Sequence, residues 1–221
     1  LSRGANWDAL KAAYDFFKDE HARDSYDGAG GQLVAEANGC DESDPTNAYW
    51  GRVSIGAKRR DGTRTYWAVG WDDTHAYVKR SNDRGQTWDD ATAPPGGIAT
   101  GDNTRASIDI SASKNAPDTA YLMSGQDRRV WQTRNRGGTW TRIDVGLVTE
   151  YAGAGTDNWE QVNYDYYVEA IPIPGGGSDL VIVGLITASA GRFNPTTNAW
   201  DWVDFARTGR ANSKAHNDQH C

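Results

Sequence analysis

The chain has 221 residues and a formal net charge of −7 at pH 7. An acidic chain lacks the basic face that nucleic-acid binding requires, so we expect no nucleic-acid partner. Its mean hydropathy is −0.74, and no run of about 18 apolar residues occurs, which predicts no membrane-spanning helix. The 10 tryptophans, 10 tyrosines and 25 glycines, against 1 methionine, favour an all-β fold over a helical one.

Residues 1–48 are predicted to form an extension before the β structure. Asn6 is a suitable helix N-cap, and four large apolar residues follow at helical spacing, which predicts a helix over residues 6–22. Residues 24–48 resemble a loop, and the acidic residues between 41 and 44 could bind Ca²⁺ through hard oxygen ligands. The alternative is a solvated acidic loop. The four apolar residues of the predicted helix are Trp7, Leu10, Tyr14 and Phe17.

The two cysteines, Cys40 and Cys221, lie far apart in the sequence. In an oxidising compartment they could form a disulfide that ties the N-terminal extension to the end of the chain. The alternative is two separate thiols. The chain begins at Leu1 rather than at an initiator Met, which indicates a mature or processed form.

One eight-residue pattern occurs twice, as Ser-Asn-Asp-Arg-Gly-Gln-Thr-Trp at 81–88 and as Thr-Arg-Asn-Arg-Gly-Gly-Thr-Trp at 133–140. The two tryptophans are 52 residues apart (140 − 88 = 52), a spacing close to that of propeller blades. Each copy predicts a tight hairpin turn. The Asp or Asn caps backbone N–H groups, the Gly takes a positive φ, and the Trp packs beneath the turn. The patterned residues are Ser81, Asp83, Gly85, Thr87 and Trp88, and Thr133, Asn135, Gly137, Thr139 and Trp140.

This pattern, Ser/Thr-x-Asp/Asn-x-Gly-x-Thr-Trp, resembles the Asp-box (BNR repeat) of β-propellers in the sialidase and sortilin-like superfamily, which includes many secreted bacterial propellers. The resemblance covers roughly residues 49–221. It implies an all-β Asp-box β-propeller and a secreted or cell-surface location in a bacterium. In that family the box lies on the outer rim of the propeller, so it implies more about the fold than about the function.

A second period of about 55 residues relates the strands that would lie innermost in each blade. It divides the chain into blades over 49–104, 105–160 and 161–213, with the first strand of a fourth over 214–221. The predicted innermost strands are 52–55, 106–110, 162–166 and 215–219, and the predicted second strands are 65–70, 119–124 and 179–184.

The third unit has a degenerate box at 193–200, which retains Trp200 but has no Asp or Gly at the patterned positions. We therefore expect this turn to be built differently. A propeller closes with about 4–8 blades, so three blades and one strand are too few. We expect the remaining blades in the same polypeptide or in a second chain.

Aspartates occupy matched positions in the predicted innermost strands, where Ser54 is their counterpart in the first unit. Innermost strands line the central channel, so we expect these carboxylates to converge there. Two carboxylates about 5–9 Å apart suit glycoside hydrolysis, and nearby arginines could bind an acidic sugar. The alternative is that the aspartates cap strand-end turns. The candidate catalytic residues are Asp109, Asp165 and Asp218, and the candidate ligand-binding residues are Arg52, Arg105, Tyr164 and Tyr166.

The resemblance to sialidases would also imply an arginine triad and a Tyr–Glu nucleophile pair. The Phe/Tyr-Arg-Ile-Pro motif that carries the first arginine in sialidases is absent, and the nearest string, 170–174, contains no arginine. A full triad cannot be assigned.

Two further groups of residues could carry function. In an extended strand His216, Asp218 and His220 share one face, where they could bind Zn²⁺ or another divalent cation or perform acid–base chemistry. A hydrogen-bonded structural strand is the alternative. Several tryptophans could stack on sugar rings, or pack between blades. These are Trp67, Trp71, Trp159, Trp200 and Trp202.

The sequence thus predicts an extracellular propeller that is part of a larger one and that binds a glycan or a protein or serves as a structural module. No cofactor is certain, and a divalent metal, Ca²⁺ or Zn²⁺, is a possibility. The alternative function is a sialidase-like or other glycoside hydrolase with its remaining catalytic residues in the missing blades. Further channel-facing Arg and Glu residues in a longer sequence would favour that alternative.

Overall fold

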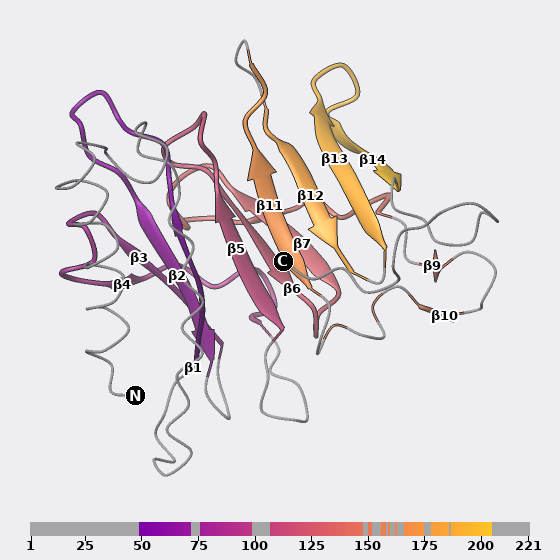
Figure 1. The fold of residues 1–221 in the computed structure, drawn as a ribbon, viewed down its shortest axis with the longest axis horizontal. Coiled ribbons are helices and arrows are strands. Elements are labelled where there is room, and N and C mark those ends of the chain that lie inside the picture. The colour runs from indigo at the N-terminus through magenta and orange to yellow at the C-terminus, as the bar shows by residue number, and fades with distance from the viewer. Residues whose placement is uncertain are drawn as a thin grey trace, which may run out of the picture.

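The computed structural model describes residues 49–71, 76–98, 107–147, 150–151, 156–157, 159, 162, 166–174, 178–185 and 187–204. This part of the chain is all-β, and its strands form three four-stranded antiparallel sheets and one two-stranded sheet (Figure 1). None of its elements is a helix that could cross a membrane. The predicted helix over residues 6–22, the acidic loop and the pair Cys40 and Cys221 lie outside the described residues.

Each four-stranded sheet is a simple meander in which the strands pair in sequence order. The first sheet contains β1 (Tyr49–Ile55), β2 (Tyr66–Trp71), β3 (Ala76–Ser81) and β4 (Asp89–Asp90); the second contains β5 (Ile108–Ala112), β6 (Ala120–Ser124), β7 (Arg129–Thr133) and β8 (Thr141–Arg142); the third contains β11 (Tyr167–Ile171), β12 (Leu180–Gly184), β13 (Ala188–Asn194) and β14 (Ala199–Asp204). The two-stranded sheet pairs β9 (Glu150–Tyr151) with β10 (Thr156–Asp157). The predicted second strands agree with β2, β6 and β12 to within one residue at each end.

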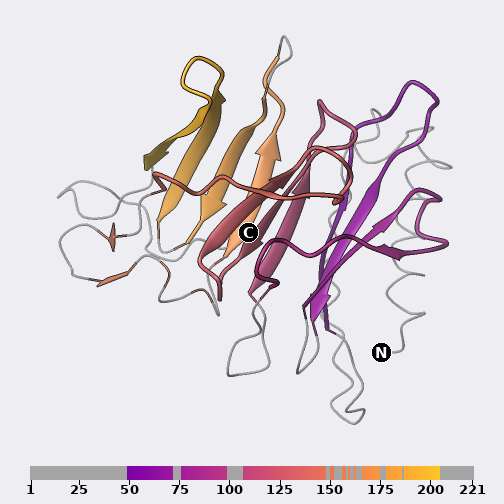
Figure 2. The same cartoon turned by 180° about the vertical axis from the view of Figure 1, so that it is seen from behind.

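The three meanders stand side by side, and their first strands adjoin one another (Figures 1 and 2). β5 contacts β1 on one side and β11 on the other. A row of four-stranded meanders with adjacent first strands is the arrangement of consecutive propeller blades. The predicted all-β class is confirmed, whereas the total number of blades stays a prediction.

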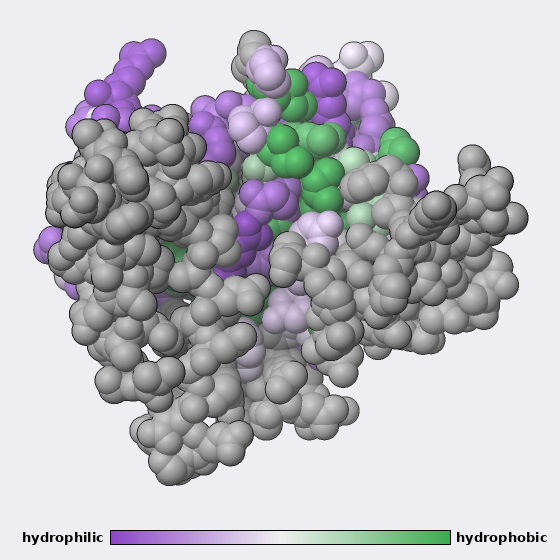
Figure 3. All heavy atoms as spheres, viewed as in Figure 1, coloured by the Kyte–Doolittle hydropathy of each residue, from purple (hydrophilic) through white to green (hydrophobic). Residues whose placement is uncertain are grey.

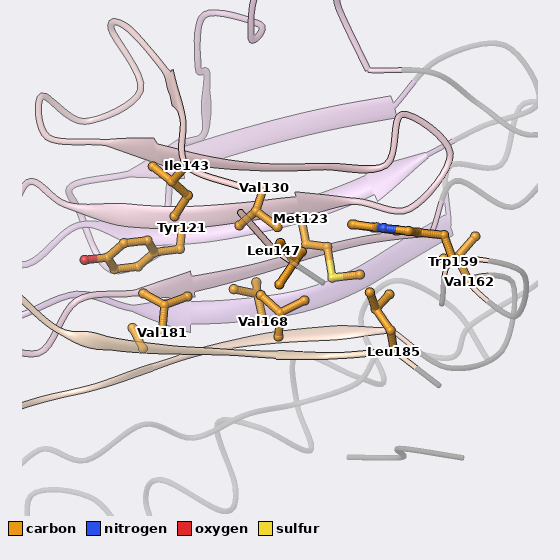
Figure 4. Close-up of a cluster of buried hydrophobic side chains, with 12 residues drawn as sticks. Tyr121, Met123, Val130, Ile143, Leu147, Trp159, Val162, Val168, Val181 and Leu185 are labelled. Carbon is orange, nitrogen blue, oxygen red and sulfur yellow. The ribbon is translucent and has the colours of Figure 1, made fainter. Parts of the chain in front are cut away.

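The second sheet is buried on both faces because alternate residues of its strands enter two different apolar cores. On β6, Leu122 belongs to the core shared with the first sheet, whereas Tyr121 and Met123 belong to the core shared with the third. On β7, Trp131 belongs to the core shared with the first sheet, and Val130 belongs to the core shared with the third. Figure 4 shows the second of these cores, with side chains from the second sheet facing Val168 and Val181 of the third. Because side chains alternate across a strand, one strand that is buried on both faces supplies both interfaces.

The third unit departs from the predicted strand alignment. Its first strand is β11, Tyr167–Ile171, so the prediction of 162–166 as the innermost strand of this unit is wrong. The predicted match between Ser54 in the first unit and Asp109 in the second is also wrong, by two residues. The backbone N–H of Ala112 donates to the Ser54 hydroxyl at 2.8 Å, and that of Ala170 donates to the Ser111 hydroxyl at 3.0 Å. The counterpart of Ser54 is therefore Ser111, not Asp109. A shift of two residues keeps every side chain on the same face, so strand alternation alone could not detect the error.

The repeated turns fold as predicted. In the first, the Asp83 Oδ1 atom accepts the N–H of Thr87 at 2.9 Å, the Ser81 hydroxyl accepts the N–H of Gly85 at 2.8 Å, and Gly85 has a φ of 84°. The second turn repeats these bonds at 2.9 Å and 2.8 Å, with a φ of 74° at the glycine. Its corresponding residues are Asn135, Thr139, Thr133 and Gly137.

Trp140, at the end of the second turn, reaches across to the first sheet. Its indole Nε1–H donates to the carbonyl oxygen of Thr92 at 2.7 Å, and its ring meets the ring of Trp67 edge-on at 6.1 Å. Trp88, in contrast, donates to the carbonyl of Gly85 within its own turn at 3.1 Å. The second turn therefore also fastens two sheets together.

The corresponding hairpin of the third sheet is built differently, as predicted. β13 and β14 pair up to Asn194 and Ala199, and the Asn194 side chain accepts the N–H of Thr196 at 3.0 Å. Asn198 closes the turn with a φ of 53°. The turn is shorter because strand pairing continues to its base, which leaves no room for the cap found in the first two sheets.

Trp140 makes both a ring contact and a hydrogen bond to the neighbouring sheet, and in this hairpin two tryptophans make one of these contacts each. Trp200 meets the ring of Tyr121 edge-on at 5.9 Å, and Trp202 donates its Nε1–H to the carbonyl oxygen of Ile143 at 2.8 Å. Tyr121 lies on β6, and Ile143 follows β8, so both contacts join the third sheet to the second.

Candidate functional site

Charged side chains from the first strands of the three sheets meet at one guanidinium group. The Arg52 Nη1 atom, on β1, donates to the Oδ2 atom of Asp109 on β5 at 3.2 Å and to the carbonyl oxygen of Val168 on β11 at 2.7 Å. The Nη2 atom of Arg52 forms an ion pair with Glu169, also on β11. One side chain thus bridges three sheets, because the meander topology places their first strands next to one another.

Asp109 is the most enclosed member of this group, with a residue exposure of 5%. Its Oδ2 atom accepts the N–H of Val168 at 2.7 Å, and its Oδ1 atom accepts the N–H of Ile110 at 2.8 Å. Burial raises the pKa of Asp109 to about 6, although the positive charge of Arg52 opposes the shift. Both carboxylate oxygens are occupied by protein donors, so the group acts as a hydrogen-bonded link between sheets.

Lys114 and Glu169 form the more accessible part of the cluster. The side chain of Glu169 is 34% exposed, whereas that of Arg52 is 11% exposed. Lys114 donates from its Nζ atom to the carbonyl of Ile55, and burial lowers its pKa to about 8, with the charge of Glu169 opposing the shift. A group of perturbed titratable side chains is a recognised mark of functional sites and of structural ion networks alike. We call Arg52, Asp109, Lys114 and Glu169 the inter-sheet ion cluster.

Sequence reasoning selected Arg52 and Asp109 but missed Glu169 and Lys114. The signal for Glu169 was a carboxylate within the otherwise uncharged run Tyr-Val-Glu-Ala-Ile of β11. A charge inside such a strand indicates a position where the charge is paired. The misplacement of the third innermost strand at 162–166 hid this signal.

The structure brings Arg52 and Asp109 together, but they bind each other rather than face an open channel. Tyr166 is half-buried and packs against the core between the second and third sheets. The other predicted site residues lie outside the described part of the chain, and their roles stay predictions. They are Arg105, Tyr164, Asp165, His216, Asp218 and His220.

The described residues contain no group of three His, Cys, Asp or Glu side chains that could hold a metal ion. The predicted Zn²⁺ strand at 216–220 and the predicted Ca²⁺ loop lie outside that part of the chain. Among the tryptophans proposed to stack on sugars, Trp67 and Trp159 are buried in the two cores, with exposures of 0% and 3%. For these two, the packing interpretation is confirmed.

No protein-family model matches the chain, and no curated protein matches it. Among solved structures, it is similar to a GH74 xyloglucanase from Xanthomonas campestris, with a TM-score of 0.49 and 12% identity over 72% of this chain and 23% of that chain. It is also similar to a mutant of NanB sialidase from Streptococcus pneumoniae, with a TM-score of 0.44 and 16% identity over 72% of this chain and 24% of that chain. The chain therefore spans less than a quarter of the length of either enzyme.

Proposed function

We propose that this chain is part of a larger Asp-box β-propeller, secreted or displayed at a bacterial cell surface, that binds a glycan or a protein ligand without turning it over. The observation that carries the proposal is the state of Asp109, the one candidate catalytic residue that the structure describes. A general acid or nucleophile must reach the reacting atom of its substrate. The oxygens of Asp109 are instead committed to Arg52 and to two backbone N–H groups.

The exposed face of the third sheet supports a larger propeller. Side chains that point away from the second sheet include Ile171, with 42% exposure, and Val203, with 63%. The space-filling view shows apolar residues gathered over β11 and β12 (Figure 3). The second sheet lies between two neighbours and is buried on both faces. A further blade packed on the third sheet would bury these side chains in the same way.

A glycoside hydrolase is the second candidate, and Glu169 favours it. This carboxylate is partly exposed, lies on a first strand and pairs with an arginine. In a complete propeller it would line the channel, where a second carboxylate from another blade could face it.

The two proposals are separated by assaying binding and turnover on the same preparations. The chain, and any longer polypeptide that contains it, would be screened on a glycan array and on fluorogenic glycosides, with Glu169→Gln and Asp109→Asn as variants. We expect glycan binding without turnover. Turnover that Glu169→Gln abolishes, with thermal unfolding unchanged, would establish the hydrolase instead. No binding to any glycan on the array would overturn the glycan-binding function.

A further inference from the structure

A groove of about 600 Å³ separates the outer strands of the second and third sheets. It lies between β7–β8 and the β13–β14 hairpin; β7, β13 and β14 are labelled in Figure 1. The inter-sheet ion cluster, in contrast, is on the first strands and their following loop. The volume falls within the range of small-ligand sites. The side chains that decide its chemistry are Gln132, Arg134, Thr141, Phe193, Asn198 and Trp200.

Arg134 is held in place at this groove by two contacts. Its Nε–H donates to the Oε1 atom of Gln132 at 3.1 Å, and its guanidinium lies 5.0 Å from the centre of the Phe193 ring. Within the described residues, its two terminal Nη groups donate to no protein acceptor. A guanidinium oriented by the protein, with its terminal donors available, loses little conformational entropy when it binds a ligand.

Gln132 is itself fixed from the interior. Its Nε2–H donates to the hydroxyl oxygen of Tyr121 at 3.1 Å, and that hydroxyl donates to the Asp179 carboxylate at 2.9 Å. Tyr121 and Asp179 are buried, with exposures of 1% and 2%. A chain of hydrogen bonds therefore runs from the core to Arg134 and sets the direction of its guanidinium.

The electrostatics of the groove favour an anion. Its other arginine, Arg142, donates to both oxygens of Asp144 at 2.8 to 3.0 Å and is thereby neutralised. No acidic side chain is among the residues described as lining the groove. The charge of Arg134 is left uncompensated there, and a guanidinium binds a carboxylate through paired N–H···O bonds.

The remaining walls suit a sugar ring. Phe193 and Trp200 are half-buried aromatics whose centroids lie 6.2 Å apart, and Thr141 and Asn198 present exposed hydroxyl and amide groups. Aromatic faces contact the C–H groups of a sugar, while neutral polar groups bond its hydroxyls. On the second-sheet side of the groove the edge strand, β8, is 2 residues long and offers a peptide little edge for strand addition.

We propose that this groove binds a saccharide that carries a carboxylate group. Arg134 pairs with the carboxylate, and Phe193 and Trp200 contact the sugar ring. The inference rests on the proposed function as a glycan-binding propeller and places one binding site on the outer strands, apart from the channel.

The test is calorimetric titration of the whole chain with a trisaccharide of galacturonic acid and with its carboxyl-reduced counterpart. We expect the acid to bind at least tenfold more tightly than the reduced sugar. Arg134→Gln should remove that preference, and Arg134→Lys should retain part of it. Arg84→Gln is the matched control, because Arg84 is an exposed arginine in the first repeated turn, remote from the groove.

A second variant keeps the inference testable if Arg134→Gln fails to fold. Thr141→Tyr adds bulk from an exposed strand position and should weaken binding at least tenfold while leaving Arg134 in place. Circular dichroism and thermal unfolding would verify that each variant is folded.

The outcomes separate this inference from the function on which it rests. If neither Arg134→Gln nor Thr141→Tyr weakens saccharide binding, the ligand binds elsewhere. That result would overturn the groove as the binding site but leave the glycan-binding function standing. Equal affinity for the acidic and reduced sugars would overturn the role of the charge. If the protein binds a tripeptide through its carboxylate, with the same dependence on Arg134, and binds no saccharide, the proposal that the ligand is a saccharide would be overturned. No binding to any glycan on the array would remove the glycan-binding function itself.

Discussion

At the scale of single residues, the environment of Asp109 decides its chemistry. The carboxylate lies within bonding distance of Arg52 and of the backbone of Val168, both from other sheets. Removing a buried acceptor of this kind leaves its donors unsatisfied, at a cost of roughly 1–3 kcal/mol for each group. Asp109 therefore has a structural role that a catalytic interpretation of the sequence would not reveal.

The raised pKa of Asp109 predicts a pH dependence of stability. Its pKa in the folded protein is about 6, against a usual value of 3.8, so the folded state binds this proton more tightly than the unfolded state. The protonated Asp109 carboxyl therefore adds its full stabilisation to the free energy of unfolding below about pH 4, and this stabilisation is lost as the pH rises through about 6. We expect the unfolding free energy of the wild type, minus that of Asp109→Asn, to fall by on the order of 2 kcal/mol between pH 4 and pH 7. Urea unfolding measures this, and a constant difference would contradict it.

Gly137, in the second repeated turn, provides a second test at this scale. A Cβ atom there would lie 2.7 Å from that of Ala91 and 3.3 Å from the Trp67 ring, at a φ of +74°. Gly97 has a similar φ of +79°, but a Cβ atom there would meet nothing within 4 Å. The Gly97→Ala variant therefore measures the cost of the backbone strain without crowding. We expect Gly97→Ala to cost about 1 kcal/mol and Gly137→Ala about 2 kcal/mol more. Equal losses in chemical unfolding would show that Gly137 is not crowded.

At the scale of elements, the outer hairpins of the second and third sheets make the same kinds of inter-sheet contact with different residues. In the second sheet Trp140 supplies both a ring contact and a hydrogen bond to the preceding sheet. In the third, Trp200 supplies the ring contact, and Trp202 supplies the hydrogen bond. Gly191 makes this possible, because a Cβ there would lie 2.6 Å from the Trp202 ring. The loss of the repeated pattern is thus offset by a second tryptophan on β14.

Removing the indole donor of Trp202 should loosen one junction selectively. Trp202→Phe leaves the Ile143 carbonyl without its partner, which we expect to cost about 1 kcal/mol. Amide hydrogen exchange should then quicken in β13 and β14 while β2 and β3 keep their protection. Trp88→Phe is the control, because Trp88 bonds within its own turn. Uniform quickening in all three sheets would argue against separate junctions.

At the scale of the whole molecule, the three sheets differ in how fully they are covered. The second is buried on both faces, whereas Ile171 and Val203 of the third are exposed on the face turned away from it. This difference is expected for a sheet that has no further sheet beside it within the described part of the chain, because each blade of a propeller buries its apolar faces against adjacent blades.

An aspartate at Val203 tests whether a further blade covers this face. In the 221-residue chain, we expect Val203→Asp to change stability by less than about 0.5 kcal/mol, since the side chain is 63% exposed. In a longer polypeptide with a blade packed there, the same change buries a charge and should cost about 2 kcal/mol or more. Val145→Asp is the control, because Val145 is 70% exposed beside the second sheet. A small effect of Val203→Asp in both proteins would contradict the packing of a blade on this face.

Local patterns predicted much of the fold because they depend on neighbouring residues. Short apolar runs that recur once in each repeat unit marked β2, β6 and β12. The positions of Asp83 and Asn135 predicted their turns, since these side chains bond groups four residues away. The absence of a patterned Asp and Gly at 193–200 correctly indicated a different turn. The candidate site was predicted less completely, because Glu169 and Lys114 were missed.

The sequence by itself determined the all-β class, the repeated turns and the second strand of each sheet, which follow from composition, the repeated pattern and turn chemistry. Only the tertiary structure decided that Ser54 corresponds to Ser111, and that Asp109 is enclosed by Arg52 and the backbone of β11. The physical reason is that these contacts join residues 57 to 59 positions apart. A strand pattern with a period of two is unchanged by a shift of two residues, so the packing of one sheet on the next selects the register.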